Sequence, residues 1–248
     1  MLSTKHQVLP WVAGLILLGL FCSAFWIIVS YEYHWEKLDG YWPNLGRGWL
    51  LTVLVSVAAL VLSVLFGALL TAAQTGPLRF ARWIARAIVE IVRGTPLLVQ
   101  ILIGYYVVAD AVGVDHRFLV GVVVLAAFSG AYLSEIFRGG IESIPESQWS
   151  SARAIGLTTG QTYRHVVLPQ AVRRVLPGTA GELANLIKNS SLLFVIGLHE
   201  FTLAAKEVNA ITYATFEPYL PLAVGYLVLT LPISLLARHL EGRFRYTS

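Results

Sequence analysis

The sequence predicts an all-α integral membrane protein that forms one transmembrane domain. Of its 248 residues, 56% are hydrophobic and only 13% are charged, and the mean hydropathy is +0.69. These values lie well outside the range of soluble domains. Several apolar stretches also reach the roughly 20 residues that a helix needs to cross a bilayer. Because little sequence remains between them, residues 1–248 are expected to hold no separate soluble domain.

About six apolar stretches are expected to cross the membrane. Four of them are clear, and two are interrupted by polar residues, which makes the interrupted pair candidates for function. The clear spans cover residues 11–30, 49–74, 117–137 and 218–237, and the interrupted ones cover residues 97–113 and 177–201. The longest segment between spans lies around residues 138–176, and the other connections are short.

The first stretch is predicted to be a membrane span rather than a signal peptide. Its apolar run continues to Val29, which is longer than the roughly 7–15 residues of a signal core. Bulky Phe21 also precedes Cys22, where a processing site would need a small residue. Since Cys22 is the only cysteine in the sequence, an internal disulfide and a cysteine-based metal cluster are both excluded.

Lysine and arginine are concentrated on one side of the predicted topology. With the N-terminus inside, the cytoplasmic segments hold Lys5, Arg79, Arg82, Arg86, Arg93, Arg138, Arg153, Arg164, Arg173, Arg174, Arg238, Arg243 and Arg245. The opposite side holds only Lys37, Arg47, Arg117 and Lys206. Because positive residues are retained on the cytoplasmic side, both termini are expected to be cytoplasmic. This bias explains the net charge of +4 without a nucleic-acid partner.

The segment between the fourth and fifth spans is expected to form two short, separately capped helices. Ser143 and Glu146 have the spacing of a capping box, and Gly156 can end that helix in the left-handed conformation. Thr158 and Gln161 repeat the capping pattern, so a second helix should run toward Leu168-Pro169. Residues 143–169 therefore predict a helical hairpin on the cytoplasmic side.

One face of this hairpin is expected to be apolar. Trp149, Ala152 and Ile155 recur at helical spacing and would pack on the spans or fit a groove in a partner. An alanine four residues before a glycine, here Ala152 and Gly156, followed by a capped second helix also resembles a DNA-binding helix-turn-helix. A hairpin tethered between two membrane spans could hardly reach the major groove of DNA. An interfacial hairpin without a partner is the structural alternative. A docking surface for an ATP-driven motor is the reading we favour.

A spaced pattern of small and apolar residues runs through the hairpin. It reads Ser150-Ser151-Ala152, then three residues, Gly156, nine residues, Val166, one residue and Leu168-Pro169. This pattern resembles the coupling-loop signature of permease subunits of bacterial ABC importers. The resemblance implies a coupling helix that sits in a cleft of the ATPase subunit. The expected coupling residues are Glu146, Trp149, Ser150, Ser151, Ala152, Arg153, Gly156, Leu168 and Pro169.

Three further motifs extend the resemblance. Residues 90–100 are similar to a segment of the polar amino acid branch, the permeases of the histidine, glutamine, arginine and glutamate type. Residues 129–136, followed by Arg138-Gly139, and residues 186–192 match the same family in order. Together the four motifs cover roughly residues 49–240, the expected permease core. Two departures stand out, since Ser150 replaces the usual glutamate of the loop and Asn189 replaces an aspartate of many relatives.

The resemblance implies a type I ABC importer permease fold and a set of partners. Two ABC ATPase subunits would lie below the membrane, and a second permease, identical or homologous, would complete the pathway. A substrate-binding protein would dock on the outer side. The chain itself would bind no cofactor, because ATP and Mg²⁺ would be held by the ATPase. The setting would be a bacterial inner membrane, with the protein surrounded by lipid.

Polar residues inside the fifth expected span point to transport independently of this resemblance. Glu182, Asn185 and Asn189 recur at i, i+3 and i+7, with Lys188 on the flank. A charged side chain at mid-bilayer costs about 2.5–3.5 kcal/mol, so such groups usually face a cavity or a partner. A zwitterionic amino acid needs a cation for its carboxylate and acceptors for its ammonium group, which this stripe offers. Alternatively, Lys188 is held by Glu182 or by a subunit interface.

The expected substrate pathway gathers polar residues from three spans. Glu135 and Arg138 are spaced to pair, and the break at Arg93-Gly94-Thr95-Pro96 either sets the entry angle of a span or acts as a gate. The pathway residues are Glu182, Asn185, Lys188, Asn189, Ser190, Ser191, Glu135, Arg93 and Thr95. Asn189 in place of an aspartate mildly favours acidic or neutral amino acids such as glutamate, aspartate or glutamine.

No catalytic or metal-binding pattern is found in the sequence. A phosphate-binding G-x-x-x-x-G-K-[ST] loop is missing, so the chain is expected to be non-catalytic and to depend on a partner for ATP hydrolysis. The six histidines are scattered without ligand spacing. The main alternative function is a secondary amino acid carrier or channel that acts without an ATPase. A non-transporting scaffold would leave the charged stripe unexplained.

Overall fold

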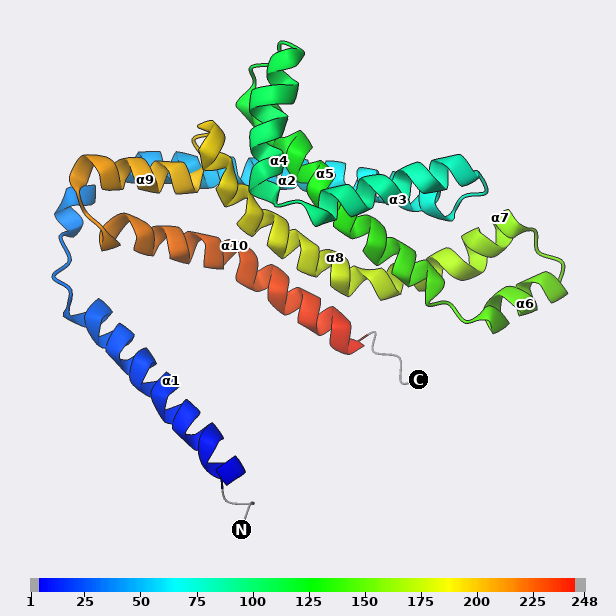
Figure 1. Ribbon diagram of the computed structural model, residues 1–248, viewed down its shortest axis with the longest axis horizontal. Helices are drawn as coiled ribbons and strands as arrows, with labels where there is room; N and C mark the ends of the chain where they lie inside the picture. The colour runs from blue at the N-terminus through cyan, green and yellow to red at the C-terminus, as the bar shows by residue number, and fades with distance from the viewer. Residues whose placement is uncertain (1–4, 244–248) are drawn as a thin grey trace.

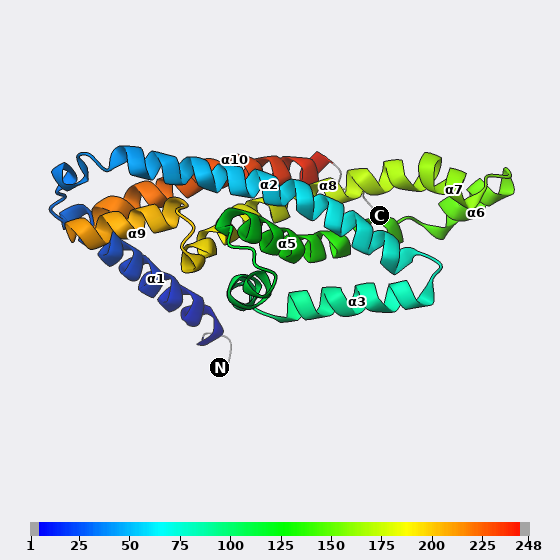
Figure 2. The ribbon, with the colours of Figure 1, turned by 90° about the horizontal axis from the view of Figure 1, so that it is seen from above.

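The computed structural model describes residues 5–243, with side chains from Val12 onward except those of Ala13 and Ala24, and every regular element in this range is helical. Four long helices run along the long axis of the molecule (Figures 1 and 2). They are α2 (Trp42–Thr75), α5 (Arg117–Glu142), α8 (Leu168–Ser190) and α10 (Phe216–Arg243). The predicted all-α class is therefore confirmed.

Three helices of the described chain, α2, α5 and α10, are long and apolar enough to cross a bilayer. A fourth crossing exists if α3 (Arg79–Gly94) and α4 (Leu97–Ile103), with the π-helical turn η2 (Gly104–Ala109), count as one span bent by 107°. Helix α8 falls short because its arginines, Glu182 and Lys188 lower its hydropathy. The expected first span, residues 11–30, falls inside α1 (Lys5–Ser30), a helix of 26 residues.

Helices α2 and α5 approach each other closely through small residues. A Cβ added at Gly67 would lie 2.9 Å from the Cβ of Leu133, and one added at Gly130 would lie 2.8 Å from the Cβ of Phe66. Thr71 of α2 donates a hydrogen bond to the Ser134 carbonyl at 3.0 Å. Small residues that let helix backbones approach are typical of packing inside membranes. The 129–136 motif therefore lies at the main helix–helix contact of the fold.

At the end opposite the hairpin, α9 (Phe201–Thr212) is held by a buried carboxylate. Glu200 is 0% exposed, and it accepts hydrogen bonds from the backbone N–H groups of Thr202 at 2.9 Å and Leu203 at 3.0 Å. The Tyr226 hydroxyl of α10 donates to the same carboxylate at 3.0 Å. A carboxylate at a helix N-terminus satisfies donors that the helix leaves free. Neither this cap nor α9 was expected from the sequence.

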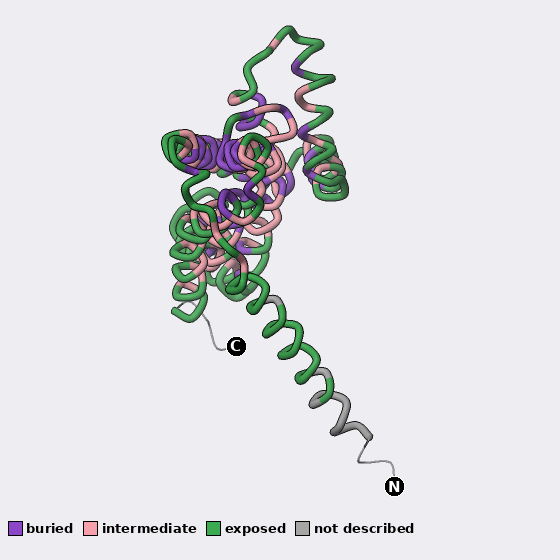
Figure 3. Tube along the Cα trace, turned by 90° about the vertical axis from the view of Figure 1, so that its left-hand side faces the viewer, coloured by how far each residue is buried: buried purple, intermediate pink, exposed green. Residues whose placement is uncertain are grey.

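Burial is concentrated in the helices around α2 and α5, whereas the described side chains of α1 are exposed (Figure 3). The short 3-10 helix η1 (Trp35–Leu38) leads from α1 into the body. Its Leu38 is fully buried and joins a small cluster with Leu45 and Phe201. A second cluster, centred on Val55 and Leu125, fills the space between α2, α5 and α8.

The expected fifth span, residues 177–201, is wrong in its bounds. Helix α8 begins at Leu168, passes through Pro177 and ends at Ser190, after which the chain forms the 3-10 helix η4 (Ser191–Ile196). Proline removes only one backbone donor, and a helix packed against neighbours tolerates that loss. The chain then turns at Gly197, whose φ of 71° is left-handed. The expected span at 97–113 contains α4 and η2, which together run from Leu97 to Ala109 and project away from the axis of α3 (Figure 1).

Most of the basic residues that the sequence assigns to the cytoplasmic side lie toward one end of the molecule. The C-terminal ends of α2, α5 and α10 and the N-terminal end of α8 share the hairpin end (Figures 1 and 2). Lys37, Arg47 and Lys206 lie toward the opposite end with η1 and α9. Arg245 lies outside the described residues, and the side chain of Lys5 is not described. Which end faces the cytoplasm stays a prediction.

Candidate functional site

The predicted hairpin projects from one end of the molecule (Figure 1). It consists of α6 (Glu146–Ala154), α7 (Thr159–Thr162) and the π-helical turn η3 (Tyr163–Val167), which leads directly into α8. Gly156 has a φ of 81°, so the expected left-handed corner is confirmed. The second helix runs toward Leu168-Pro169 as expected and continues through η3 into α8. Pro169 sits in the first turn of α8, where its missing N–H costs little.

One of the two predicted capping boxes is present. The Gln161 N–H donates to the Thr158 hydroxyl at 3.3 Å, and the Thr158 N–H donates to the Gln161 side chain at 2.8 Å. The capping box predicted at Ser143 and Glu146 is not formed, because Pro145 is the N-cap of α6. Ser143 still belongs to the end of α5, where its N–H donates to the Gly139 carbonyl at 3.0 Å.

The outward side of α6 is polar and held by internal contacts. The Arg153 guanidinium lies 2.7 Å from Oε1 of Glu146 and 3.4 Å from the Ser150 hydroxyl. Glu146, Ser150, Ser151 and Arg153 are all exposed. Ser150 thus supplies no charge on this side of the helix. Glu146, one turn earlier, supplies a carboxylate on the same helix.

The inward side of α6 packs on the hairpin itself. Trp149 meets the ring of Tyr163 edge-on at 5.1 Å, and Ala152 is only 3% exposed. Ile155 does not share this face as expected, because α6 ends at Ala154 and Ile155 is 78% exposed. Trp149 and Ala152 therefore shape the hairpin, whereas Ile155 presents an apolar side chain at its corner.

A cleft of about 380 Å³ lies between α5 and α8. Its lining residues are Phe128, Tyr132, Glu182, Asn185, Lys188 and Asn189. The structure thus brings the four residues of the predicted polar stripe to one cleft. Glu182 is buried, at 8% exposure, while Lys188 is exposed. Within the described chain no ion pair joins Lys188 to Glu182, but the charge of Lys188 acts on the Glu182 carboxylate, and the alternative in which Glu182 holds the lysine stays a prediction.

Two arginines and two glutamates form a charged cluster beside the cleft, next to its lining residue Tyr132. Arg138 donates to both carboxylate oxygens of Glu135, at 2.6 and 3.1 Å, so the predicted pair is confirmed. A second guanidinium, that of Arg93 in α3, lies 3.4 Å from Glu135 and 5.2 Å above the Tyr132 ring. The far side of Arg138 reaches Glu142 at 2.7 Å. Each guanidinium thus faces a carboxylate, and the end of α3 is tied to α5 beside the cleft.

Three expected pathway residues face their own backbone instead of the cleft. The Ser190 and Ser191 hydroxyls donate to the carbonyls of Ile187 at 2.8 Å and Lys188 at 2.7 Å. The Thr95 hydroxyl donates to the Ile91 carbonyl at 2.9 Å and accepts from the Gln100 amide at 2.8 Å. These bonds stabilise the ends of α8 and the bend between α3 and α4. None of the three side chains lines the cleft.

The sequence reasoning missed the two aromatic walls of the cleft. The rings of Phe128 and Tyr132 lie 4.9 Å apart on one face of α5. Their i, i+4 spacing was visible in the sequence, but aromatic pairs at that spacing are common in helices that merely pack. Only the position of α8 shows that this pair borders the polar stripe.

Comparison with known proteins gives consistent matches. Residues 63–246 match the family described as "Binding-protein-dependent transport system inner membrane component". The probable glutamine ABC transporter permease GlnM of Bacillus subtilis is 34% identical over 77% of this chain and 89% of its own length. The glutamine transport system permease GlnP of Escherichia coli is 34% identical over 86% of this chain and 99% of its own. The crystal structure of an amino acid ABC transporter with histidines superposes with a TM-score of 0.79 and 32% identity, covering 86% of this chain and 100% of that one.

Proposed function

The chain belongs to the family of binding-protein-dependent transport system inner membrane components, and from this premise we propose that it carries glutamine or a similar polar amino acid. The relatives at 34% identity are named for glutamine transport, which fits a substrate with an uncharged polar side chain. The single observation that carries the proposal is the cleft in which Glu182, Lys188 and two asparagines meet. Acidic amino acids such as glutamate and aspartate are the next candidates.

The cleft has the groups that a zwitterion requires. Lys188 supplies a cation for the substrate carboxylate, and the Glu182 carboxylate supplies an acceptor for the ammonium group. Asn185 and Asn189 add donors and acceptors that can bind a side-chain amide without a net charge. Tyr132 and Phe128 close the apolar side of the cleft. The cleft therefore combines two aromatic walls with polar groups that can orient a substrate.

In this proposal the hairpin is the contact with an ATPase. The exposed groups on α6 are Glu146, Ser150, Ser151 and Arg153, and Ile155 adds an apolar side chain at the corner. Because η3 continues into α8, a push on the hairpin acts directly on the helix that carries Lys188.

Two ATPase subunits would hold the ATP and Mg²⁺, while this chain remains non-catalytic. A second permease would close the cleft, and a substrate-binding protein would deliver the amino acid from outside. Both termini would lie in the cytoplasm of a bacterium.

Competition between amino acids tests the substrate class. Proteoliposomes that hold the chain with its ATPase, its partner permease and its binding protein would be assayed for uptake of labelled glutamine. Unlabelled glutamine should compete fully, glutamate more weakly, and arginine least, since Asn189 offers no carboxylate to pair with a cationic side chain. Stronger competition by arginine than by glutamine would overturn the assignment.

A further inference from the structure

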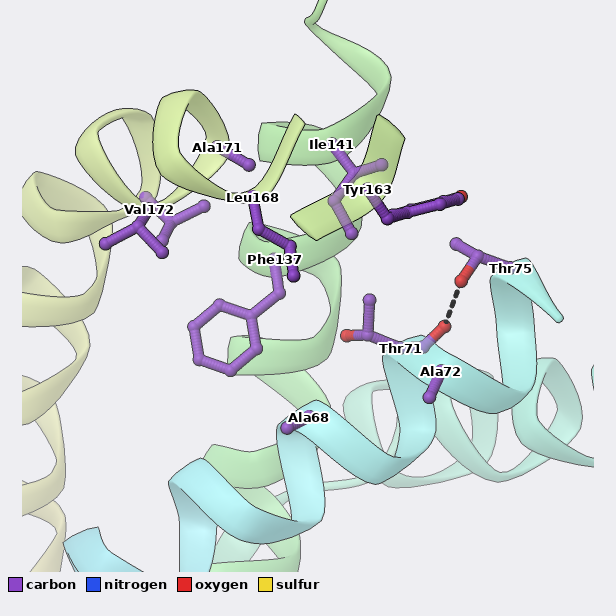
Figure 4. Close-up of a pocket in the computed structure, with 11 residues that line it drawn as sticks. Ala68, Thr71, Ala72, Thr75, Phe137, Ile141, Tyr163, Leu168, Ala171 and Val172 are labelled. Carbon is purple, nitrogen blue, oxygen red and sulfur yellow. Dashed lines mark hydrogen bonds between the residues drawn. The ribbon is translucent and has the colours of Figure 1, made fainter. Parts of the chain in front are cut away.

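A second cavity lies at the hairpin end of the molecule, away from the polar cleft. It holds about 400 Å³, and its walls include Ala68, Thr71, Ala72, Thr75, Phe137, Tyr163 and Val172. These residues come from α2, α5, η3 and the start of α8 (Figure 4). Several of them, including Ala68, Ala72 and Val172, are exposed, so the cavity opens to the surroundings of the spans. No lining residue is shared with the polar cleft.

The walls of this cavity are suited to an apolar occupant. The Thr71 hydroxyl donates to the carbonyls of Gly67 at 2.8 Å and Ser134 at 3.0 Å. The Thr75 hydroxyl donates to the Thr71 carbonyl at 2.9 Å (Figure 4). Both threonines therefore use their donors within the helices and offer mainly methyl groups. A site with few free polar groups does not hold water well and favours hydrocarbon.

The chain segments around the cavity are basic. Residues 68–89 and 155–181 contain no acidic residue, and they carry Arg79, Arg82, Arg86, Arg164, His165, Arg173 and Arg174. The Arg82 guanidinium donates to the Gly76 carbonyl at 2.7 Å, which holds it beside the end of α2 that forms one wall. Arg164 directly follows the lining residue Tyr163. On the α5 wall, Glu135 and Glu142 are both paired with Arg138.

We propose that this cavity binds one acyl chain of an anionic phospholipid from the leaflet on the hairpin side, with the phosphate near Arg82 and Arg164. Hydrocarbon is the apolar material that surrounds α2 and α5, and basic groups beside it select a negative headgroup. The lipid would contact Tyr163, whose ring packs on Trp149 of α6. It would therefore brace the hairpin against the spans. This inference is independent of the transported amino acid.

Native mass spectrometry of the purified complex tests the proposal. The complex is placed in nanodiscs with equal amounts of phosphatidylglycerol and phosphatidylcholine, then released into mild detergent. The wild type should retain phosphatidylglycerol in several-fold preference over phosphatidylcholine. Ala72→Phe, which fills the cavity, should lose the bound lipid. Ala223→Phe, a matched change at an exposed alanine of α10, should retain it.

A charge variant and a second filling variant make the outcome decisive. Arg82→Gln should remove the preference for phosphatidylglycerol, while Arg238→Gln, at the exposed end of α10, should keep it. If Ala72→Phe does not fold, Ala68→Phe on the same wall takes its place. Equal lipid retention by the wild type and the folded filling variant would overturn the proposal. So would loss of the partner permease or ATPase from the filling variant without loss of lipid, because the cavity would then belong to a subunit interface.

Discussion

Arg93 lies over the ring of Tyr132, with its guanidinium carbon 5.2 Å from the ring centroid. Arg93 is in the last turn of α3, just before the 107° bend into α4, and Tyr132 forms a wall of the polar cleft. The contact therefore links the bend to the cleft through one aromatic ring. A shift of α3 relative to α5 would move this wall, so the pair connects the position of the bend to the shape of the proposed substrate site.

Replacing Tyr132 with leucine should weaken substrate transport by removing this ring. A cation–π contact is worth about 0.5–2 kcal/mol, so the apparent KM for glutamine should rise several-fold. Tyr132→Phe keeps the aromatic face and should stay near the wild type. The measurement is glutamine uptake by the complex in proteoliposomes at a series of substrate concentrations. Equal KM values for the two variants would show that the ring under Arg93 is not needed.

Replacing Lys188 with alanine should strongly reduce uptake at low glutamine concentration. A hydrogen bond to a charged group contributes about 1.5–3 kcal/mol, which predicts at least a tenfold rise in KM. Lys37→Ala is the matched control, because Lys37 is an exposed lysine at the far end of the molecule. Unchanged uptake in Lys188→Ala would return this lysine to a purely structural role, such as a subunit interface.

Adding a single methyl group at Gly67 should destabilise the contact between α2 and α5. The new Cβ would lie 2.9 Å from the Cβ of Leu133 and 3.1 Å from the Gly130 carbonyl oxygen. Overpacking of this kind costs about 1–3 kcal/mol, so Gly67→Ala should lower the melting temperature of the purified chain. Gly46→Ala, on the same helix but with open space around it, serves as the control. A melting temperature that is the same in both variants would contradict the close packing of these helices.

Placing a charge at the hairpin corner should weaken binding of the ATPase. Ile155 is 78% exposed beside Gly156, and an apolar group at an exposed corner suits a partner's groove. Ile155→Asp should therefore reduce the amount of ATPase that co-purifies with the chain. Ile211→Asp, at a 60% exposed isoleucine of α9 at the other end, should leave it unchanged. Full recovery of the ATPase with Ile155→Asp would rule out the corner as a contact.

The sequence predicted the helices well wherever hydrophobicity alone decides them. The expected spans at 49–74, 117–137 and 218–237 all fall inside helices of the structure, because long apolar runs have few alternatives in a bilayer. The Gly156 corner and the Thr158 cap were also predicted, since both depend on local backbone chemistry. Helix ends were less accurate, as the extension of α5 to Glu142 shows.

Features that depend on tertiary contacts were harder to predict. The bend between α3 and α4 is stabilised by Gln100, whose amide donates to the Val92 carbonyl at 2.7 Å and the Thr95 carbonyl at 3.1 Å. A proline in the sequence shows a break but not its angle. The cleft was predicted on the α8 side, where the polar stripe has helical spacing. Its aromatic side comes from α5, and no local pattern shows that these two helices face each other.

The measurement that tests the central claim most directly is ATP-driven uptake by a reconstituted complex. Proteoliposomes containing the chain, its partner permease, the ATPase and the binding protein would be loaded with ATP and Mg²⁺ and supplied with labelled glutamine. The account predicts accumulation that stops when the ATPase is replaced by a hydrolysis-deficient variant. Equal accumulation by the chain without the ATPase, driven by an ion gradient, would contradict it and identify a secondary carrier.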